Sequence, residues 1–254
     1  MIRVVINGIL GRMGEALTRV LSKEEDFFLV GGVDTLETFY NEEIVVSTNP
    51  EDVLMDVDVV VDFSSGEGCA AIADACREKG IPLVTGTTGL TDEEQQKINQ
   101  LAEIVPVVQA FNFSIGINLL NNVIQQAASI LKDNYDIEIV EIHHRYKKDA
   151  PSGTARMFAN TLAEIQGLTD EEIRFGRSGN NLSRGDEITI HSLRGGSIIG
   201  EHQIHFFCKN EHLSFIHHSL SRRVFVDGAL RAIEWVVTQK PGLYSMNDVL
   251  SIES

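Results

Sequence analysis

A run of protonatable side chains stands out in an otherwise acidic sequence. Residues 143–148 are His-His-Arg-Tyr-Lys-Lys, and five of these six side chains are, or can become, cationic. His143 and Lys147 are groups that can exchange protons with a bound ligand at ordinary pH. A basic loop in solvent is the alternative explanation, because short runs of charge are common on protein surfaces.

The residues that follow this run predict the start of a helix with an anion site. Pro151 disfavours helical backbone at the residue before it, and Ser152 is suited to cap a helix N-terminus. The amides of Gly153 and Thr154 then lie in the first turn, where a carboxylate can bind. Together with the preceding protonatable groups, this block suits general acid–base chemistry on a dicarboxylate that carries an imine.

Glycines near the start of the chain predict a dinucleotide site. The apolar run 2–7 leads into Gly8, Gly11 and Gly14, which have the spacing GxxGxxG. Such glycines allow a tight turn and the close approach of a pyrophosphate to helix amides. The second apolar run ends at Asp34, whose carboxylate can accept hydrogen bonds from the adenosine ribose. A turn that needs glycine only for steric reasons is the alternative.

Two further loops follow apolar runs, at 86–89 and 110–114. Ligands of open α/β sheets bind beyond the carboxyl ends of the strands, so both loops are expected to meet the nicotinamide end of the cofactor. Ordinary turn chemistry explains each loop equally well when it is taken alone.

The elements that must position these residues fall into two groups. The first 110 residues alternate apolar runs with amphipathic stretches, the pattern of βαβ units with a parallel sheet covered on both faces. The strands expected there are 2–7, 28–33, 57–62, 82–85 and 106–109.

After residue 112 the pattern changes. Helices are expected at about 115–131 and from about 152, and strands at 137–143, 187–193, 200–207 and 213–218; the tail from 224 to 250 is expected to be helical, and residues 194–196 to form a hairpin turn. The sequence thus predicts an α/β protein: a Rossmann-type doubly wound parallel sheet plus a second α+β domain with a mixed or antiparallel sheet. The expected domains are 1–114 for the dinucleotide, 115–223 for substrate and oligomerisation, and 224–254 as a segment that returns to the first domain.

Composition restricts the class of protein and its partners. The 254 residues are 43% hydrophobic and 23% charged, which is ordinary for a globular protein. A formal net charge of −16 argues against nucleic acid and anionic membranes as partners. Three scattered cysteines, no signal-peptide pattern and no apolar run of membrane-spanning length indicate a cytoplasmic protein. The histidine pairs 202/205 and 217/218 lack a third ligand, so no metal is expected.

The combination and order of the motifs resemble those of the 4-hydroxy-tetrahydrodipicolinate reductase family over nearly the whole chain. The shared motifs are GxxGRMG at 8–14, GTTG at 86–89, NFSxGxN at 112–118, HHxxKxDAPSGTA at 143–155 and RGGxxxGEH at 194–202. The resemblance implies NAD(P)H-dependent reduction of 4-hydroxy-tetrahydrodipicolinate to tetrahydrodipicolinate, with loss of water, in diaminopimelate and lysine biosynthesis. It also implies a Rossmann domain closed by the C-terminal segment, and a central domain that assembles a homotetramer.

Carried over residue by residue, the resemblance assigns His143 as catalytic acid–base and Lys147 as proton donor during hydride transfer to C4. The residues expected to hold the substrate carboxylate are His144, Gly153 and Thr154. The residues expected to bind the cofactor are Gly8, Ile9, Leu10, Gly11, Arg12, Met13, Asp34, Gly86, Thr87, Thr88, Ala110, Phe111, Asn112 and Phe113.

Two positions depart from the family pattern. Phe111 stands where a smaller residue or proline is expected, beside the nicotinamide. Thr35 stands where some members carry a basic residue that meets the 2′-phosphate of NADP. Asp34 followed by Thr35 therefore favours NADH over NADPH, although Arg12 could offset this preference.

Two rival functions remain open at this level. A semialdehyde-type dehydrogenase would need a cysteine nucleophile with a partner base, and Cys69 and Cys76 have no adjacent histidine. A dinucleotide-sensing regulator would keep the glycine turn but would not need His143, Lys147 and Gly153.

Overall fold

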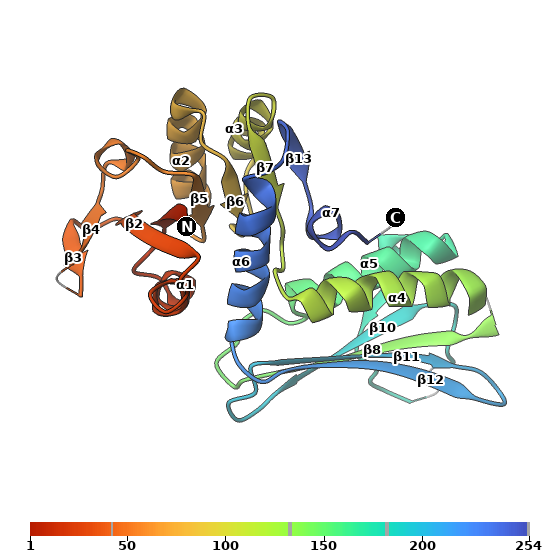
Figure 1. Cartoon of the computed structure of the whole chain (residues 1–254). Helices are drawn as coiled ribbons and strands as arrows, with labels where there is room; N and C mark the ends of the chain where they lie inside the picture. Colours follow the sequence, from red (N-terminus) through yellow and green to blue (C-terminus); the bar gives the residue numbers. More distant parts are fainter. Residues whose placement is uncertain (42, 132–133, 181–182, 253–254) are drawn as a thin grey trace. The chain divides into compact units, whose positions relative to one another are not determined.

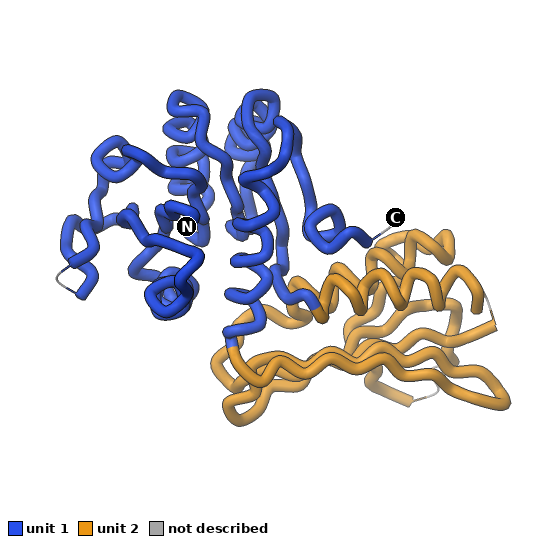
Figure 2. Tube along the Cα trace, viewed as in Figure 1, with its two compact units in different colours: residues 1–115, 222–254 blue, residues 116–221 orange. Residues whose placement is uncertain are grey.

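The computed structural model describes residues 1–41, 43–131, 134–180 and 183–252. The chain divides into two compact units (Figure 2). Unit 1 comprises Met1–Ile115 and Arg222–Ser254, and unit 2 comprises Gly116–Ser221. Unit 1 is therefore built from two separate stretches of chain.

The described residues of unit 1 form an eight-stranded sheet in the order β13-β7-β6-β5-β1-β2-β4-β3 (Figure 1). The strands are β1 (Ile2–Asn7), β2 (Phe27–Val33), β3 (Thr38–Tyr40), β4 (Ile44–Ser47), β5 (Val59–Asp62), β6 (Leu83–Thr85), β7 (Pro106–Gln109) and β13 (Gly242–Tyr244). All neighbouring strands are parallel except β3 and β4, which are antiparallel. The predicted Rossmann-type sheet is confirmed.

Helices cover both faces of this sheet, as a parallel sheet requires. The helices of unit 1 are α1 (Arg12–Leu21), α2 (Gly66–Lys79), α3 (Asp92–Ala102), α6 (Arg223–Val236) and α7 (Met246–Leu250). Buried residues of α2 and α3 pack with Val5, Val60 and Val107 on one face, whereas those of α1 and α6 pack with Val4 and Val61 on the other. The alternate residues of each strand thus supply two separate cores.

The expected helix over the whole tail is wrong. Helix α6 ends at Val236, and β13 and α7 follow it. Pro241 and Gly242 explain the break, because proline restricts the residue before it and glycine is a poor helix former. The three residues of β13 then pair in parallel with β7. Residues 253–254 of the expected C-terminal segment 224–254 lie outside the described residues.

Unit 2 contains a five-stranded sheet within its described residues, in the order β12-β11-β8-β10-β9. Its strands are β8 (Asp136–His143), β9 (Ile173–Phe175), β10 (Ile188–Arg194), β11 (Gly200–Phe207) and β12 (His212–Ser219). Strands β8, β9 and β10 are parallel, and β11 runs antiparallel to both of its neighbours, so the sheet is mixed. Helices α4 (Ile115–Leu131) and α5 (Gly153–Gln166) pack on one face.

The turn at 194–196 is not a hairpin connection, contrary to expectation. Strand β8 lies between β10 and β11 in the sheet. The connection therefore crosses the end of β8, where the Gly195 amide donates to the carbonyl of His143 at 3.0 Å and the Arg145 amide donates to Gly196 at 3.3 Å. This crossing brings Arg194 and Gly200 beside the last residues of β8.

Candidate active site

The glycine turn of unit 1 lies between β1 and α1. Gly8 has φ +79°, and a Cβ there would lie 2.6 Å from the Phe63 carbonyl oxygen. A Cβ at Gly14 would lie 2.3 Å from the Gly8 carbonyl oxygen. Gly11 is the N-cap of α1 and offers no side chain to its first-turn amides. Close backbone packing and an uncapped helix N-terminus are what a bound pyrophosphate requires.

Asp34 stands directly against this turn. Its Oδ2 accepts a hydrogen bond from the Leu10 amide at 2.9 Å, and its Oδ1 accepts from the Thr35 amide at 2.8 Å. Ile9, in contrast, is fully buried, and its side chain occupies the space where Gly32 would carry a Cβ. Arg12 is exposed at the start of α1, and Met13 is half-buried. Because its side chain is buried, Ile9 can contact a ligand only through its backbone.

A buried carboxylate that sequence reasoning missed joins the loops at the carboxyl edge of the sheet. Asp62 ends β5 and is fully buried. It accepts hydrogen bonds from the side chains of Asn7 at 2.8 Å, Ser64 at 2.5 Å, Thr85 at 2.7 Å and Thr87 at 2.6 Å. The only sequence signal for this role is one acidic residue at the end of an apolar strand.

The two further loops follow β6 and β7, as expected. In the first, Thr87 is buried and donates its hydroxyl to Asp62, while Thr88 is exposed; Gly86 packs against the ring of Phe63, where a Cβ would lie 2.2 Å from a ring carbon. Thr87 therefore shapes the loop, and Thr88 is the threonine that can face a ligand.

The second loop has one exposed and one buried phenylalanine. Phe111 is 77% exposed, whereas Phe113 is buried and its ring packs edge-on against Phe63 at 5.4 Å. Ala110 is half-buried, and the Asn112 side chain accepts from the Ser114 amide at 2.8 Å. Phe113 thus belongs to the core, and Phe111 is free of the constraint that a buried position would impose.

In unit 2, the end of β8 carries a buried cluster of polar side chains. Glu141 is fully buried and His143 is 9% exposed; both point to the face of the sheet that α4 and α5 cover. The His143 Nδ1 lies 2.5 Å from Glu141 Oε2. Arg194 binds both carboxylate oxygens of Glu141, at 2.7 and 2.8 Å. Sequence reasoning missed Glu141, Arg194 and their link, although residues 137, 139, 141 and 143 share one face of a strand.

Burial by itself would raise the pKa of the Glu141 carboxyl. Hydrogen bonds from His143 and Arg194 outweigh burial and hold that pKa far below its ordinary value. Glu141 is therefore ionised at neutral pH.

Helix α5 begins beside this cluster. Ser152 is its N-cap, as predicted, and its hydroxyl accepts from the Ala155 amide at 3.2 Å. Gly153 is exposed and Thr154 is half-buried in the first turn. His144 is half-buried, and its Nδ1 has no hydrogen-bond partner among the described residues. A first turn that contains no acidic side chain suits a carboxylate ligand.

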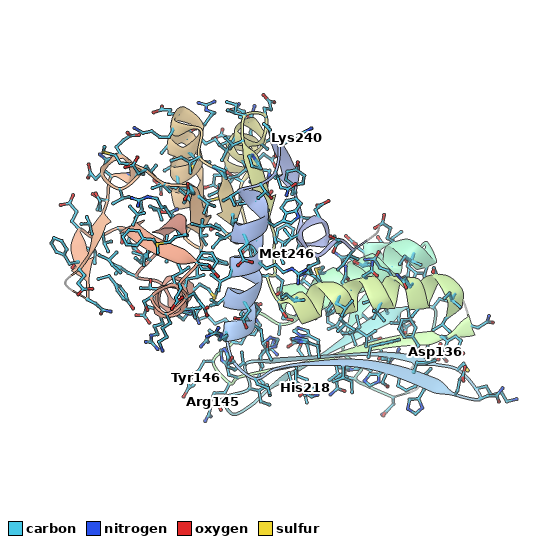
Figure 3. All side chains as sticks on the ribbon, viewed as in Figure 1. Asp136, Arg145, Tyr146, His218, Lys240 and Met246 are labelled. Carbon is cyan, nitrogen blue, oxygen red and sulfur yellow. The ribbon has the colours of Figure 1, made fainter. Side chains whose placement is uncertain are left out.

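Lys147 lies on the loop between β8 and α5. Its Nζ is 2.9 Å from the Asp149 carboxylate, and its side chain is only 22% exposed. Arg145 and Lys148 are exposed, and Figure 3 shows Arg145 and Tyr146 at the edge of unit 2. The structure thus separates Lys147, which is held and mostly covered, from neighbours that face solvent.

A second buried histidine contacts this cluster. The ring of His202 packs edge-on against His143 at 5.3 Å, and its Nε2 lies 3.2 Å from the Ser152 hydroxyl. Burial, followed by the charge of His143, lowers the pKa of His202 to about 3. His202 is therefore neutral at physiological pH and places no positive charge beside His143.

Cys69 and Cys76 do not support the rival nucleophilic mechanism. Cys69 and Cys76 are buried, and burial raises the pKa of both thiols far above its ordinary value. A thiol held in that way is not available as a thiolate nucleophile. Among the described residues, no three histidine, cysteine or acidic side chains are grouped as metal ligands. No helix within the described ranges has the length and apolar character to cross a bilayer.

Family models and curated relatives of the same name match nearly the whole chain. Residues 2–113 match the family model described as dihydrodipicolinate reductase, N-terminus, and residues 116–250 match the model of its C-terminus. A 4-hydroxy-tetrahydrodipicolinate reductase of Methanospirillum hungatei JF-1 is 44% identical, covering 99% of this chain and 100% of its own. One of Myxococcus xanthus is 38% identical, covering 100% and 99%.

Solved structures give the same result. Dipicolinate-bound dihydrodipicolinate reductase from Paenisporosarcina sp. TG-14 is similar with a TM-score of 0.81 and 29% identity, and the match covers 100% of both chains. A myo-inositol dehydrogenase from Corynebacterium glutamicum has a TM-score of 0.58 at 17% identity, covering 95% of this chain and 90% of its own, and shares the fold alone.

Proposed function

The chain belongs to the dihydrodipicolinate reductase family, and from that membership we propose that it reduces 4-hydroxy-tetrahydrodipicolinate to tetrahydrodipicolinate, with loss of water. It is an NAD(P)H-dependent oxidoreductase of diaminopimelate and lysine biosynthesis. We also propose that hydride adds to C4 of the substrate and that Lys147 and His143 transfer the protons.

The residues at the glycine turn of unit 1 are suited to bind the cofactor. NAD(P)H, when bound, supplies the hydride. The amides of Arg12 and Met13, at the uncapped start of α1, would bind the pyrophosphate, and Asp34 would accept from the adenosine ribose. Thr88 and Phe111, both exposed at the carboxyl edge of the sheet, would contact the nicotinamide end. The same two loops contain the proposed cofactor residues Gly86, Thr87, Ala110, Asn112 and Phe113.

Unit 2 offers the dicarboxylate site and the acid–base groups. The first-turn amides of Gly153 and Thr154, with His144, would hold a substrate carboxylate. Hydride addition to C4 leaves electron density on the ring nitrogen or the adjacent carbon, and Lys147 would neutralise it by giving a proton. His143 would exchange the further proton that loss of the 4-hydroxyl as water requires.

The observation that carries this proposal is the clustering at the end of β8. There, His143 lies against ionised Glu141, and the Lys147 loop leads directly into the capped start of α5. A protein that only senses dinucleotides would need the glycine turn but not this arrangement.

Steady-state kinetics on enzymatically generated substrate test the proposal. We expect NADH or NADPH oxidation, followed at 340 nm, that depends on the dicarboxylate and yields tetrahydrodipicolinate. Tight cofactor binding without oxidation would contradict the reductase assignment and favour a sensor.

A further inference from the structure

The buried carboxylate of Glu141 has all of its acceptor positions filled. Oε2 accepts from Arg194 at 2.8 Å and faces His143 Nδ1 at 2.5 Å, while Oε1 accepts from Arg194 at 2.7 Å and from the Ser152 amide at 3.1 Å. A two-pronged pair between arginine and a carboxylate is strong and fixes the direction of both groups. Glu141 therefore cannot rotate without breaking several contacts at once.

This arrangement determines where the proton of His143 lies. An ionised carboxylate only accepts hydrogen bonds, so the nitrogen that faces Glu141 must be the one that carries hydrogen. Nδ1 of His143 is that nitrogen. Nε2 is then the nitrogen that gains and loses a proton.

The residue of β11 beside Nε2 is a glycine. A Cβ at Gly200 would lie 3.2 Å from Nε2, closer than most side-chain contacts, and glycine avoids this contact. His202 packs against the ring as a neutral group. Arg194, for its part, also donates to the Asp149 carbonyl at 2.6 Å, and the Asp149 carboxylate pairs with Lys147. The same arginine therefore links the two proposed proton-transfer groups.

We propose that Glu141, held by Arg194, is a positioning residue that keeps His143 in its Nδ1–H tautomer and presents Nε2 for proton exchange with the substrate. This inference rests on the proposed function, because it takes His143 as the acid–base. In this arrangement the orientation of the imidazole is set by a carboxylate that does not itself contact the substrate.

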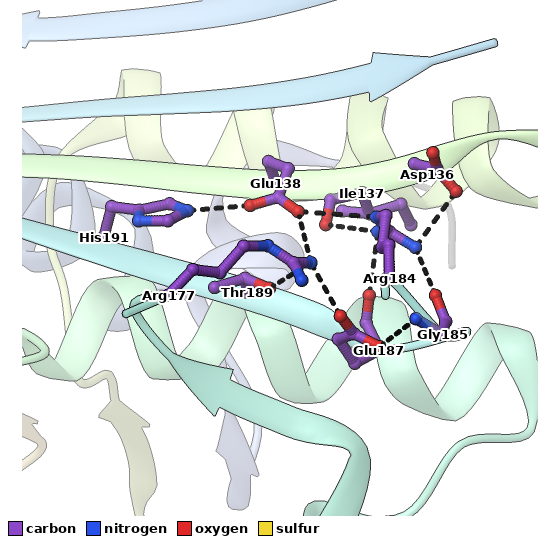
Figure 4. Close-up of polar contacts among 9 residues, drawn as sticks. All are labelled: Asp136, Ile137, Glu138, Arg177, Arg184, Gly185, Glu187, Thr189 and His191. Atoms are coloured by element: carbon purple, nitrogen blue, oxygen red, sulfur yellow. Dashed lines mark hydrogen bonds and ion pairs between the residues drawn. The ribbon is translucent and has the colours of Figure 1, made fainter. Parts of the chain in front are cut away.

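The same strand contains a matched control. Glu138 holds His191 at 2.7 Å and pairs with Arg177 at 3.0 Å (Figure 4). Because side chains alternate along a strand, Glu138 lies on the face of β8 opposite to Glu141. It thus offers the same kinds of partner, a histidine and an arginine, away from the proposed catalytic cluster.

The first test is the tautomer itself, measured on the wild-type protein. In ¹⁵N-histidine spectra at neutral pH, with His143→Asn to assign the signal, neutral His143 should show hydrogen on Nδ1 and none on Nε2. Hydrogen on Nε2 instead would overturn the inference. This measurement requires neither turnover nor a variant of Glu141.

The second test compares Glu141→Gln with Glu138→Gln. The glutamine amide can donate a hydrogen bond to Nδ1, which would favour the tautomer with hydrogen on Nε2. We expect kcat to fall by roughly 10²-fold or more, with KM for NADH nearly unchanged. Glu138→Gln should keep wild-type turnover.

The outcomes separate the two proposals. An inactive wild-type protein would refute the proposed function, while the tautomer remains measurable. An active wild-type protein whose Glu141→Gln variant keeps full turnover would refute the positioning role alone. If Glu141→Gln does not fold, the tautomer measured in the wild-type protein tests the positioning role by itself.

Discussion

At the scale of single residues, Lys147 is the side chain whose replacement should separate catalysis from cofactor binding. Lys147→Ala removes the ammonium that would neutralise the charge left by hydride addition. We expect kcat to fall by on the order of 10²-fold or more, while NADH binding stays nearly intact, as measured by steady-state kinetics and fluorescence titration.

The neighbouring lysine is the control for this prediction. Lys148 is exposed, whereas Lys147 is held by Asp149. Lys148→Ala should therefore leave kcat close to that of the wild type. Equal damage from both replacements, or wild-type turnover in Lys147→Ala, would show that the mechanism assigned to this loop is wrong.

Cofactor choice is a second question at this scale. Asp34 places a carboxylate against the glycine turn, with Thr35 beside it, and such a carboxylate suits ribose hydroxyls but repels a 2′-phosphate. The wild type should prefer NADH. Asp34→Asn should raise kcat/KM for NADPH relative to NADH by about tenfold, or about 1.4 kcal/mol.

Glu103→Gln, an exposed change at the C-terminal end of α3, is the control and should not alter the ratio. A wild-type kcat/KM for NADPH more than about tenfold above that for NADH would contradict the predicted preference.

The sequence shows which side chains can exchange protons, but it does not show which of them are hydrogen-bonded to one another in the folded chain. His143 and Lys147 could be singled out because titratable side chains followed by Ser-Gly-Thr form a local pattern. Glu141 could not, because its role depends on Arg194, which is 53 residues away. Asp62 escaped for the same reason, since its partners come from three different strand ends.

At the scale of elements, α6 packs closely against the loop after β7 at Gly228. A Cβ at Gly228 would lie 1.7 Å from the Phe113 carbonyl oxygen. Gly228→Ala should therefore force the helix and the loop apart, at a cost of about 1–3 kcal/mol or more in the free energy of unfolding. The melting temperature should fall by several degrees, as measured by calorimetry.

Glu234→Ala, an exposed replacement on the same helix, provides the comparison and should change stability by less than about 0.5 kcal/mol. An unchanged melting temperature in Gly228→Ala would mean that this contact yields easily.

Long apolar runs made most strands predictable, and short or edge strands escaped. β1 and β7 have the bounds expected from the sequence. The sequence did not predict β3, β4, β9 and β13, which have three or four residues each. β3, β9 and β13 lie at sheet edges, and β4 pairs with the edge strand β3. The sequence also did not predict that the connection from β10 to β11 crosses β8. A short turn rich in glycine has the same sequence pattern whether or not the two strands that it connects pair with each other.

At the scale of the whole molecule, the family resemblance leads us to expect a homotetramer. The sheet face of unit 2 opposite α4 and α5 leaves large apolar side chains half-exposed, including Leu193, Phe207 and Ile216. Such surface is typical of a face that another subunit covers. Light scattering should give about four times the chain mass of 28.1 kDa. A stable, fully active monomer at micromolar concentration would contradict this.

The discontinuity of unit 1 has a consequence for the order of folding during synthesis. Its core combines Val4 and Ile6 from the start of the chain with Ala229 and Ile233 from α6. A ribosome releases the whole of unit 2 before it releases α6, so until then one face of the nascent Rossmann sheet lacks α6 and is only partly covered, by α1. Unit 2 is contiguous and can close first. Chaperones that bind apolar surface should therefore engage the early strands until the last segment emerges.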